Sequence, residues 1–154
     1  MSDRFLPYAR QSVSEEDIQA VVDVLRGDWL TTGPAIESFE QELMRVSGAG
    51  HAIAVSSGTA ALHAAYAGGG LGCGDEVITS PLTFAATANM ALLCGAQVRF
   101  ADVDPETGLI DPARVAEQLT ERTRMIVGVD YAGHPADYGA LREVAQAHGK
   151  GGAE

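Results

Sequence analysis

From residue 52 onward the chain repeats one pattern: a short apolar segment, a turn, and a longer segment with helical character. The paired segments are 52–55 with 59–67, 76–79 with 84–94, 97–101 with 112–120, and 124–129 with 137–148. Short apolar segments that alternate with helices of this length are typical of βαβ units. The pattern therefore predicts an α/β fold, an α/β/α sandwich whose sheet is mostly parallel. In such sheets ligands bind at the carboxyl ends of the strands, so the turns after the strands are the places to search for a site.

Two amphipathic segments precede the first predicted strand. Ser14 is a suitable N-cap, and the three acidic residues after it suit the positive end of a helix dipole. Apolar residues then recur at helical spacing as far as Gly27, and again over residues 35–47. We therefore expect a helical segment ahead of the α/β part. The expected parts of the chain are the helical segment at residues 1–50, the α/β part at 51–149 and a tail at 150–154.

The composition argues against several classes of function. The formal net charge is −11, from 21 acidic and 10 basic residues, and a surface of that sign repels nucleic acid. No apolar run approaches the length of a bilayer span, and residues 1–10 lack the apolar core of a signal peptide, so we expect a cytoplasmic protein. Cys73 and Cys94 have neither the spacing nor the histidine neighbours of a metal site. The acidic loop at residues 102–111 resembles a calcium loop, but its glycine comes one place late and no bidentate glutamate follows. No metal site is predicted.

The turn after the first predicted strand is the best candidate for an anion site. It reads Ser56-Ser57-Gly58-Thr59 and opens a predicted helix. The first N–H groups of a helix have no partners inside it, and the helix dipole places partial positive charge there. Gly58 allows a ligand to approach the backbone closely, and the hydroxyls of Ser57 and Thr59 add donors, which suits a phosphate. The alternative is that Ser57 only caps the helix, which is the commoner role of serine at such a position.

The turns after two other strands add single candidates. Pro81 keeps its loop extended and brings Phe84 near the start of the next helix, on the same side of the sheet as the Ser57 turn. An aromatic ring there either stacks on a planar ligand or covers the core. Tyr131 and His134 follow the fourth strand, although a single histidine before a proline is more often a loop residue than a general base. No Gly-x-Gly-x-x-Gly motif follows any strand, which argues against a dinucleotide fold in the strict sense.

Four segments together resemble one family. They are Trp29-Leu-Thr-Thr-Gly-Pro34, Ser56-Ser-Gly-Thr-Ala-Ala-Leu-His63, Ser80-Pro-Leu-Thr-Phe-Ala-Ala-Thr-Ala-Asn89 and Gly95-Ala-Gln-Val-Arg-Phe-Ala-Asp-Val-Asp104. In order and spacing they resemble the DegT/DnrJ/EryC1/StrS sugar-nucleotide aminotransferases, which are pyridoxal-phosphate enzymes of fold type I. Within the family the chain is most similar to the enzymes that aminate C4 of a UDP-4-keto-6-deoxy-N-acetylhexosamine on the way to pseudaminic acid. The α/β part then corresponds to a portion of the family's large, cofactor-binding domain.

The resemblance implies a ping-pong transamination that uses pyridoxal 5'-phosphate, with glutamate as the expected amino donor and a nucleotide sugar as the acceptor. It implies that Gly58, Thr59 and Ala60 hold the cofactor phosphate and that Phe84 stacks on the pyridine ring. The substrate-side positions that it implies are Thr31, Thr32, Gly33, Tyr131 and His134. The complete enzyme is expected to be a homodimer.

The resemblance also bears on the catalytic residues. In the family, the lysine that forms a Schiff base with the cofactor and the aspartate that keeps the pyridine nitrogen protonated both lie beyond the position of Gly149. Here the chain reads Lys150-Gly-Gly-Ala-Glu154, so no catalytic residue is assigned in it. We therefore expect the N-terminal part of a sugar aminotransferase that is inactive alone. The alternative is a non-catalytic module with the same fold fragment that binds a phosphorylated ligand or a partner chain.

Overall fold

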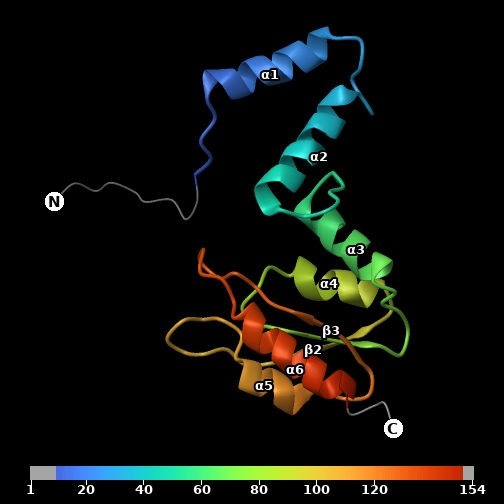
Figure 1. Cartoon of the computed structure of the whole chain (residues 1–154), viewed down its shortest axis with the longest axis vertical. Helices are drawn as coiled ribbons and strands as arrows, with labels where there is room; N and C mark the ends of the chain where they lie inside the picture. The colour runs from blue at the N-terminus through green and yellow to red at the C-terminus, as the bar shows by residue number, and fades with distance from the viewer. Residues whose placement is uncertain (1–9, 151–154) are drawn as a thin grey trace, which may run out of the picture. The chain divides into compact units, whose positions relative to one another are not determined.

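The computed structural model describes residues 10–150 (Figure 1). The chain divides into two compact units between Ala54 and Val55. Among the described residues, no helix combines the length and the apolar character needed to cross a membrane.

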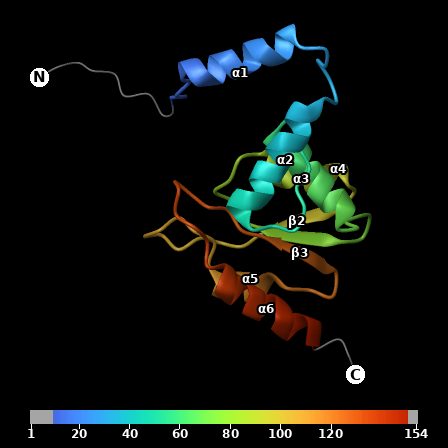
Figure 2. The same cartoon turned by 45° about the horizontal axis from the view of Figure 1, so that its top comes forward.

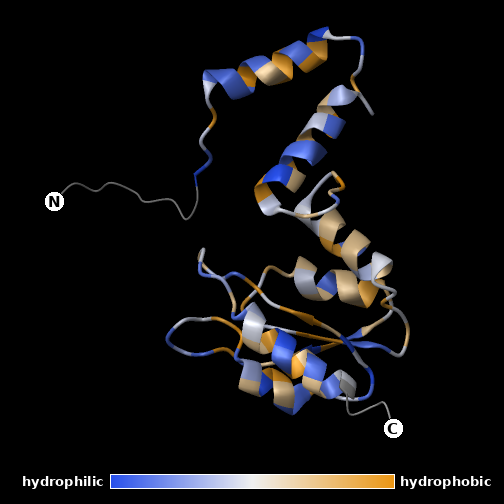
Figure 3. Ribbon diagram, in the orientation of Figure 1, coloured by the Kyte–Doolittle hydropathy of each residue, from blue (hydrophilic) through white to orange (hydrophobic). Residues whose placement is uncertain are grey.

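The first unit contains helices α1 (Glu15–Arg26) and α2 (Pro34–Ser47), close to the two predicted helices. Ser14 is the N-cap of α1, and with Asp17 it forms a capping box in which each side chain bonds the backbone amide of the other residue. Gly48 ends α2 in the left-handed conformation, with φ of 71°. Both helices carry alternating hydrophobic and hydrophilic stripes (Figure 3). Neither helix has a buried residue.

Residues 52–55, which the sequence predicts as the first strand, form no strand within residues 10–150, so this prediction is wrong. The amide of Ala54 donates to Glu40 Oε1 of α2 at 2.8 Å, and Ile53 is 81% exposed. A parallel strand needs a neighbouring strand to pair with its N–H and C=O groups, and an apolar pattern does not supply one. The segment is therefore an extended connection that leads into the second unit.

The second unit is built on a sheet of three parallel strands, β1 (Glu76–Thr79), β2 (Gln97–Phe100) and β3 (Thr123–Val127), in the order β2-β1-β3. All three lie where the sequence predicts strands. β1 is central because both of its edges are paired, which explains why its four residues are all buried.

Four helices cover the two faces of this sheet. They are α3 (Gly58–Gly68), α4 (Ala86–Leu93), α5 (Pro112–Gln118) and α6 (Tyr138–Lys150). Helices α3 and α4 lie on one face, and α5 and α6 lie on the other (Figures 1 and 2). The predicted α/β/α architecture with a parallel sheet is thus confirmed.

The core consists of two apolar clusters, one on each face of the sheet. Successive residues of β1 point to opposite faces, so Val77 joins the cluster under α3 and α4 while Ile78 joins the cluster over α5 and α6. Neither side chain has any accessible surface. In register, Val77 lies beside Val98 of β2 and Met125 of β3, which also pack in the first cluster.

The first residue of β1 places a buried carboxylate at the amino end of the sheet. Glu76 is 1% exposed and accepts hydrogen bonds from Thr120 Oγ1 at 2.7 Å and from Arg122 Nη2 at 2.5 Å. The Thr120 hydroxyl contributes most to lowering the pKa of Glu76, and the charges of Arg122 and Arg99 lower it further. The Glu76 carboxylate is therefore bonded by protein groups at the amino end of the sheet.

Candidate functional site

The N-terminus of α3 carries the predicted anion turn. Ser57 caps the helix: its Oγ accepts from the amide of Ala60 at 3.2 Å and its carbonyl accepts from the amide of Ala61 at 3.0 Å. The capping role is thus real, and it uses one of the amides that the resemblance assigns to phosphate. Within the described residues, the amides of Gly58 and Thr59 have no hydrogen-bond partner.

Space for a ligand lies directly beside Gly58. A Cβ added to this glycine would meet no atom within 4 Å, so the absence of a side chain is not required by protein packing. Two open amides at the positive end of a helix dipole, next to free space, are the usual components of an anion site.

A hollow of about 650 Å³ extends from this turn along α3 to the start of α4. Its wall is mostly small and apolar. The lining residues are Gly58, Thr59, Ala61, Leu62, Ala65, Phe84 and Ala86. Three of the four predicted cofactor residues thus line one cavity, whose volume is in the usual range of about 300–1,000 Å³ for small-molecule sites. Ala60 is not among them.

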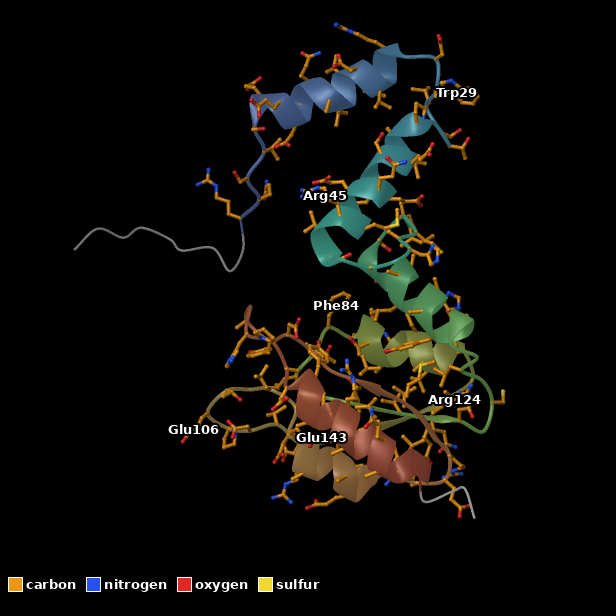
Figure 4. All side chains as sticks on the ribbon, in the orientation of Figure 1. Trp29, Arg45, Phe84, Glu106, Arg124 and Glu143 are labelled. Carbon is orange, nitrogen blue, oxygen red and sulfur yellow. The ribbon has the colours of Figure 1, made fainter. Side chains whose placement is uncertain are left out.

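Phe84 is the only aromatic residue in this lining. Its side chain is 77% exposed and stands out from the loop before α4, away from the sheet (Figure 4). A large apolar ring so exposed does not cover the core, which removes one of its two predicted roles. Its ring is available for contact with a ligand.

The loop that carries Phe84 is held by its own hydroxyl groups. Ser80, which is buried, accepts from the amide of Leu82 at 3.0 Å through its Oγ. The Oγ1 atoms of Thr83 and Thr87 share a hydrogen bond at 2.7 Å, and the amide of Thr87 donates to the carbonyl of Phe84 at 3.0 Å. The backbone of Phe84 is therefore fixed although its ring is exposed.

One further hydrogen bond joins α3 to α4. The hydroxyl of Tyr66, a residue that is 3% exposed, donates to the carbonyl oxygen of Thr87 at 2.9 Å. Burial raises the pKa of Tyr66. Sequence patterns identify neither Tyr66 nor Thr87 as part of the site, and the only signal is a single tyrosine within an alanine-rich helix.

Tyr131 and His134 lie on a tight turn after β3. The amide of His134 donates to the carbonyl of Tyr131 at 3.0 Å, and Ala132 and Gly133 between them have φ of 53° and 81°. A Cβ added at Gly108 would lie 2.9 Å from Tyr131 Cδ1, so the tyrosine ring packs directly on that backbone. The loop after β2 thus supports the turn that carries both predicted substrate-side residues.

The remaining substrate-side residues lie in the first unit. Thr32 has an unusual φ of 51°, and a Cβ added at Gly33 would lie 2.6 Å from Trp29 Cβ, so only glycine fits there. Thr32 and Gly33 line a separate hollow of about 540 Å³, in which Trp29 supplies an aromatic wall. Thr31 is exposed, and its carbonyl accepts from Thr32 Oγ1 at 2.8 Å. This loop is therefore a structured surface of the first unit.

No group of three His, Cys, Asp or Glu side chains that could hold a metal ion occurs among residues 10–150.

Comparison with known proteins gives consistent results. A sequence model of the DegT/DnrJ/EryC1/StrS aminotransferase family matches residues 11–150. The spore coat polysaccharide biosynthesis protein SpsC of Bacillus subtilis (strain 168) is 46% identical over 147 residues, which cover 96% of this chain and 38% of SpsC. The UDP-4-amino-4-deoxy-L-arabinose–oxoglutarate aminotransferase of Shewanella sediminis is 43% identical over 146 residues, 95% of this chain and 38% of that protein. The chain therefore spans about 38% of the length of these curated relatives.

Solved structures show the same fold. The PLP form of Spr1654, a sugar aminotransferase from Streptococcus pneumoniae, superposes with a TM-score of 0.86 at 32% identity, covering 90% of this chain and 36% of that one. PseC of Helicobacter pylori, an aminotransferase of pseudaminic acid biosynthesis, gives a TM-score of 0.85 at 33% identity, covering 93% and 39%. The α/β unit thus has the architecture of fold type I pyridoxal-phosphate aminotransferases.

Proposed function

Because this chain belongs to the DegT/DnrJ/EryC1/StrS aminotransferase family, we propose that its second unit holds pyridoxal 5'-phosphate in the hollow between α3 and α4. One observation supports this most directly: two unpaired helix N-terminal amides, of Gly58 and Thr59, line the same cavity as the exposed ring of Phe84. A phosphate joined to a planar ring would engage both features at once.

The phosphate is assigned to the start of α3. The amides of Gly58 and Thr59 donate to it, and the helix dipole favours its negative charge. The amide of Ala60 is the proposed third donor, which requires that it leave Ser57 Oγ. The net charge of −11 does not oppose this binding, because backbone amides bind an anion locally.

Phe84 is assigned to the pyridine ring. Its backbone is fixed by the bond from Thr87, and its exposed face offers an apolar surface on which an aromatic ring can stack. When bound, pyridoxal phosphate supplies the electron sink that allows an amino group to move between an amino acid and a carbonyl compound. The chain's own contribution is to hold and orient the ring and to exclude water from one of its faces.

The proposed reaction transfers an amino group from glutamate to C4 of a UDP-4-keto-6-deoxy-N-acetylhexosamine. The likeness to PseC supports the pseudaminic acid branch, while the Shewanella relative, named for a UDP-sugar and oxoglutarate, supports the nucleotide sugar and the glutamate donor. We assign the acceptor side to the tight turn after β3 and to the loop before α2. The residues so assigned are Thr31, Thr32, Gly33, Tyr131 and His134.

This chain spans only about 38% of its curated relatives, so the whole reaction is proposed for a protein of the relatives' length. That protein is proposed to act as a homodimer. In that assembly residues 1–50 would contribute the acceptor-side loop before α2, and residues 51–149 would contribute the contacts to the cofactor and the acceptor-side turn after β3. The proposal for the chain itself is therefore limited to cofactor binding.

Binding of pyridoxamine 5'-phosphate tests this proposal without requiring turnover. We expect its fluorescence anisotropy to rise on titration with the protein, whereas pyridoxamine, which lacks the phosphate, should bind much more weakly. Replacing Gly58 with Asp should weaken binding about tenfold or more through charge repulsion. The substitution should not harm folding, because a Cβ there meets nothing within 4 Å and an acidic residue suits a helix N-terminus.

Gly50→Asp is the matched control, since that glycine also has free space around it, needs no positive φ and lies in the other unit. Equal weakening by both substitutions would contradict the assignment. Binding of inorganic phosphate as tight as that of pyridoxamine 5'-phosphate would favour the alternative, a non-catalytic module for phosphorylated ligands.

A further inference from the structure

The hydrogen bond from Tyr66 to Thr87 joins the two elements that form the walls of the hollow. Tyr66 lies on α3, directly after the last lining residue of that helix, Ala65. Thr87 lies in the first turn of α4, directly after the lining residue Ala86. Their bond at 2.9 Å is buried on both sides, with Tyr66 and Thr87 both almost wholly covered.

Thr87 passes this connection to the loop that carries Phe84. Its Oγ1 shares the hydrogen bond at 2.7 Å with Thr83, and its amide donates to the carbonyl of Phe84. One residue therefore contacts α3 through its carbonyl, the loop through its hydroxyl, and Phe84 through its amide. The carbonyl, hydroxyl and amide of Thr87 are separate groups, so the three contacts do not compete with one another.

We infer that Tyr66 and Thr87 are positioning residues that set the separation between the anion-binding amides at the start of α3 and the ring of Phe84. The inference rests on the proposed function, since it concerns the same hollow. The start of α3 carries Gly58 and Thr59, so any movement of α3 relative to α4 changes the span that a phosphate-and-ring ligand must bridge. Neither positioning residue touches the ligand.

The chemistry of Tyr66 favours this role over simple packing. A phenylalanine would fill the same apolar cluster without the cost of burying a hydroxyl. In Tyr66 the hydrogen bond to the Thr87 carbonyl offsets that cost and fixes the geometry of the contact. The bond is directional, whereas the apolar contacts of this cluster are not.

The test compares two ligands that differ in whether they bridge the hollow. Phosphorus NMR titrations give the affinities of pyridoxamine 5'-phosphate and of inorganic phosphate for the intact chain. Tyr66→Phe and Thr87→Val should each weaken pyridoxamine 5'-phosphate by roughly threefold to tenfold, the effect of losing one hydrogen bond, and leave inorganic phosphate unchanged. Thr87→Ser keeps the hydroxyl and should restore most of the affinity.

Tyr138→Phe is the matched control. It also removes a tyrosine hydroxyl with one hydrogen bond, to Asp130 Oδ1 at 2.8 Å, but on α6 at the opposite face of the sheet. Melting curves of every variant report whether it folds. Thr87→Val removes the hydroxyl bond to Thr83 and leaves the bond from Tyr66 to the Thr87 carbonyl in place, so if Tyr66→Phe is too unstable to titrate, Thr87→Val and Thr87→Ser still test the positioning role of Thr87.

The outcomes separate the inference from the function on which it rests. An unchanged ratio of the two affinities in Tyr66→Phe and Thr87→Val overturns the inference alone, as does an equal loss for both ligands, which would indicate general destabilisation. If the wild-type chain binds pyridoxamine 5'-phosphate no more tightly than inorganic phosphate, the proposed function and the inference are both overturned.

Discussion

Replacing Ser57 with alanine tests the two competing uses of the α3 N-terminus. The Oγ of Ser57 accepts from the amide of Ala60 at 3.2 Å and is the side-chain cap of this helix. Loss of a serine N-cap costs about 1 kcal/mol, within a range of about 0.5–2 kcal/mol. In a unit of about 100 residues that loss lowers the melting temperature by roughly 4–8 °C. The free variant should therefore melt below the wild type.

Although Ser57→Ala should be less stable than the wild type, it should bind the ligand more tightly. In the wild type a phosphate must displace Ser57 Oγ to reach the amide of Ala60, whereas in Ser57→Ala that amide is already open. A net hydrogen bond of about 0.5–1.5 kcal/mol corresponds to about twofold to tenfold tighter binding of pyridoxamine 5'-phosphate by the variant. The rise in melting temperature caused by the ligand should be correspondingly larger, because ligand stabilisation grows with the ratio of ligand concentration to Kd.

Melting followed by far-ultraviolet circular dichroism, with and without pyridoxamine 5'-phosphate, measures both effects. Ser14→Ala is the matched control, because it removes the N-cap of α1 in the other unit and should leave the affinity unchanged. If Ser57→Ala has the same melting temperature as the wild type, the cap makes no measurable contribution to stability. Weaker binding by Ser57→Ala would mean that the hydroxyl donates to the ligand, and the reasoning from competition would be wrong.

Two further predictions concern stability. Gly95 has φ of 88°, and a Cβ added to it would lie 2.7 Å from Cys73 Sγ, so Gly95→Ala should lower the free energy of unfolding by about 1–3 kcal/mol; urea denaturation measures this, and a loss no larger than that of Gly50→Ala would contradict it. The pKa of Glu76 is lowered in the folded state, chiefly by the Thr120 hydroxyl, so its contribution is present above the ordinary glutamate pKa and is lost as the pH falls through and below that value. Urea midpoints of Glu76→Gln should therefore fall less on acidification than those of the wild type, and parallel pH profiles would refute this assignment.

The strands that the sequence predicts correctly share a local cause. Residues 77–79 are a continuous apolar or β-branched run directly after Glu76, bounded by turn residues on both sides, and with Glu76 they form β1. Residues 52–55 show a similar run but form no strand, because pairing depends on a partner that the run does not specify. Local pattern thus predicts where a strand is possible, and only long-range pairing decides whether it forms.

The candidate site likewise contains features that local sequence predicts and features that depend on long-range packing. Gly58 and Phe84 follow from turn chemistry, since a glycine after a serine N-cap and an aromatic residue after a proline loop have positions that local rules restrict. The bond between the Tyr66 hydroxyl and the Thr87 carbonyl could not be predicted, because it depends on how two helices cross and joins residues 21 positions apart. The hydrogen bond from the Ala60 amide to Ser57 Oγ is predicted only in part: the capping alternative predicts it, and the phosphate assignment does not.

The polar groups at the amino end of the sheet and at the N-terminus of α3 differ in whether they are paired, and this contrast supports the proposed position of the ligand. At the amino end the carboxylate of Glu76 is buried and bonded by Thr120 and Arg122 from the segment that precedes β3. A buried charge without such partners would be strongly destabilising, so the Glu76 carboxylate is committed to bonds within the protein. On the α3 side the amides of Gly58 and Thr59 remain open beside an apolar cavity, and they are stable there only because water reaches them. A ligand that brings its own anion can replace that water without leaving the amides unpaired, whereas a neutral apolar ligand cannot.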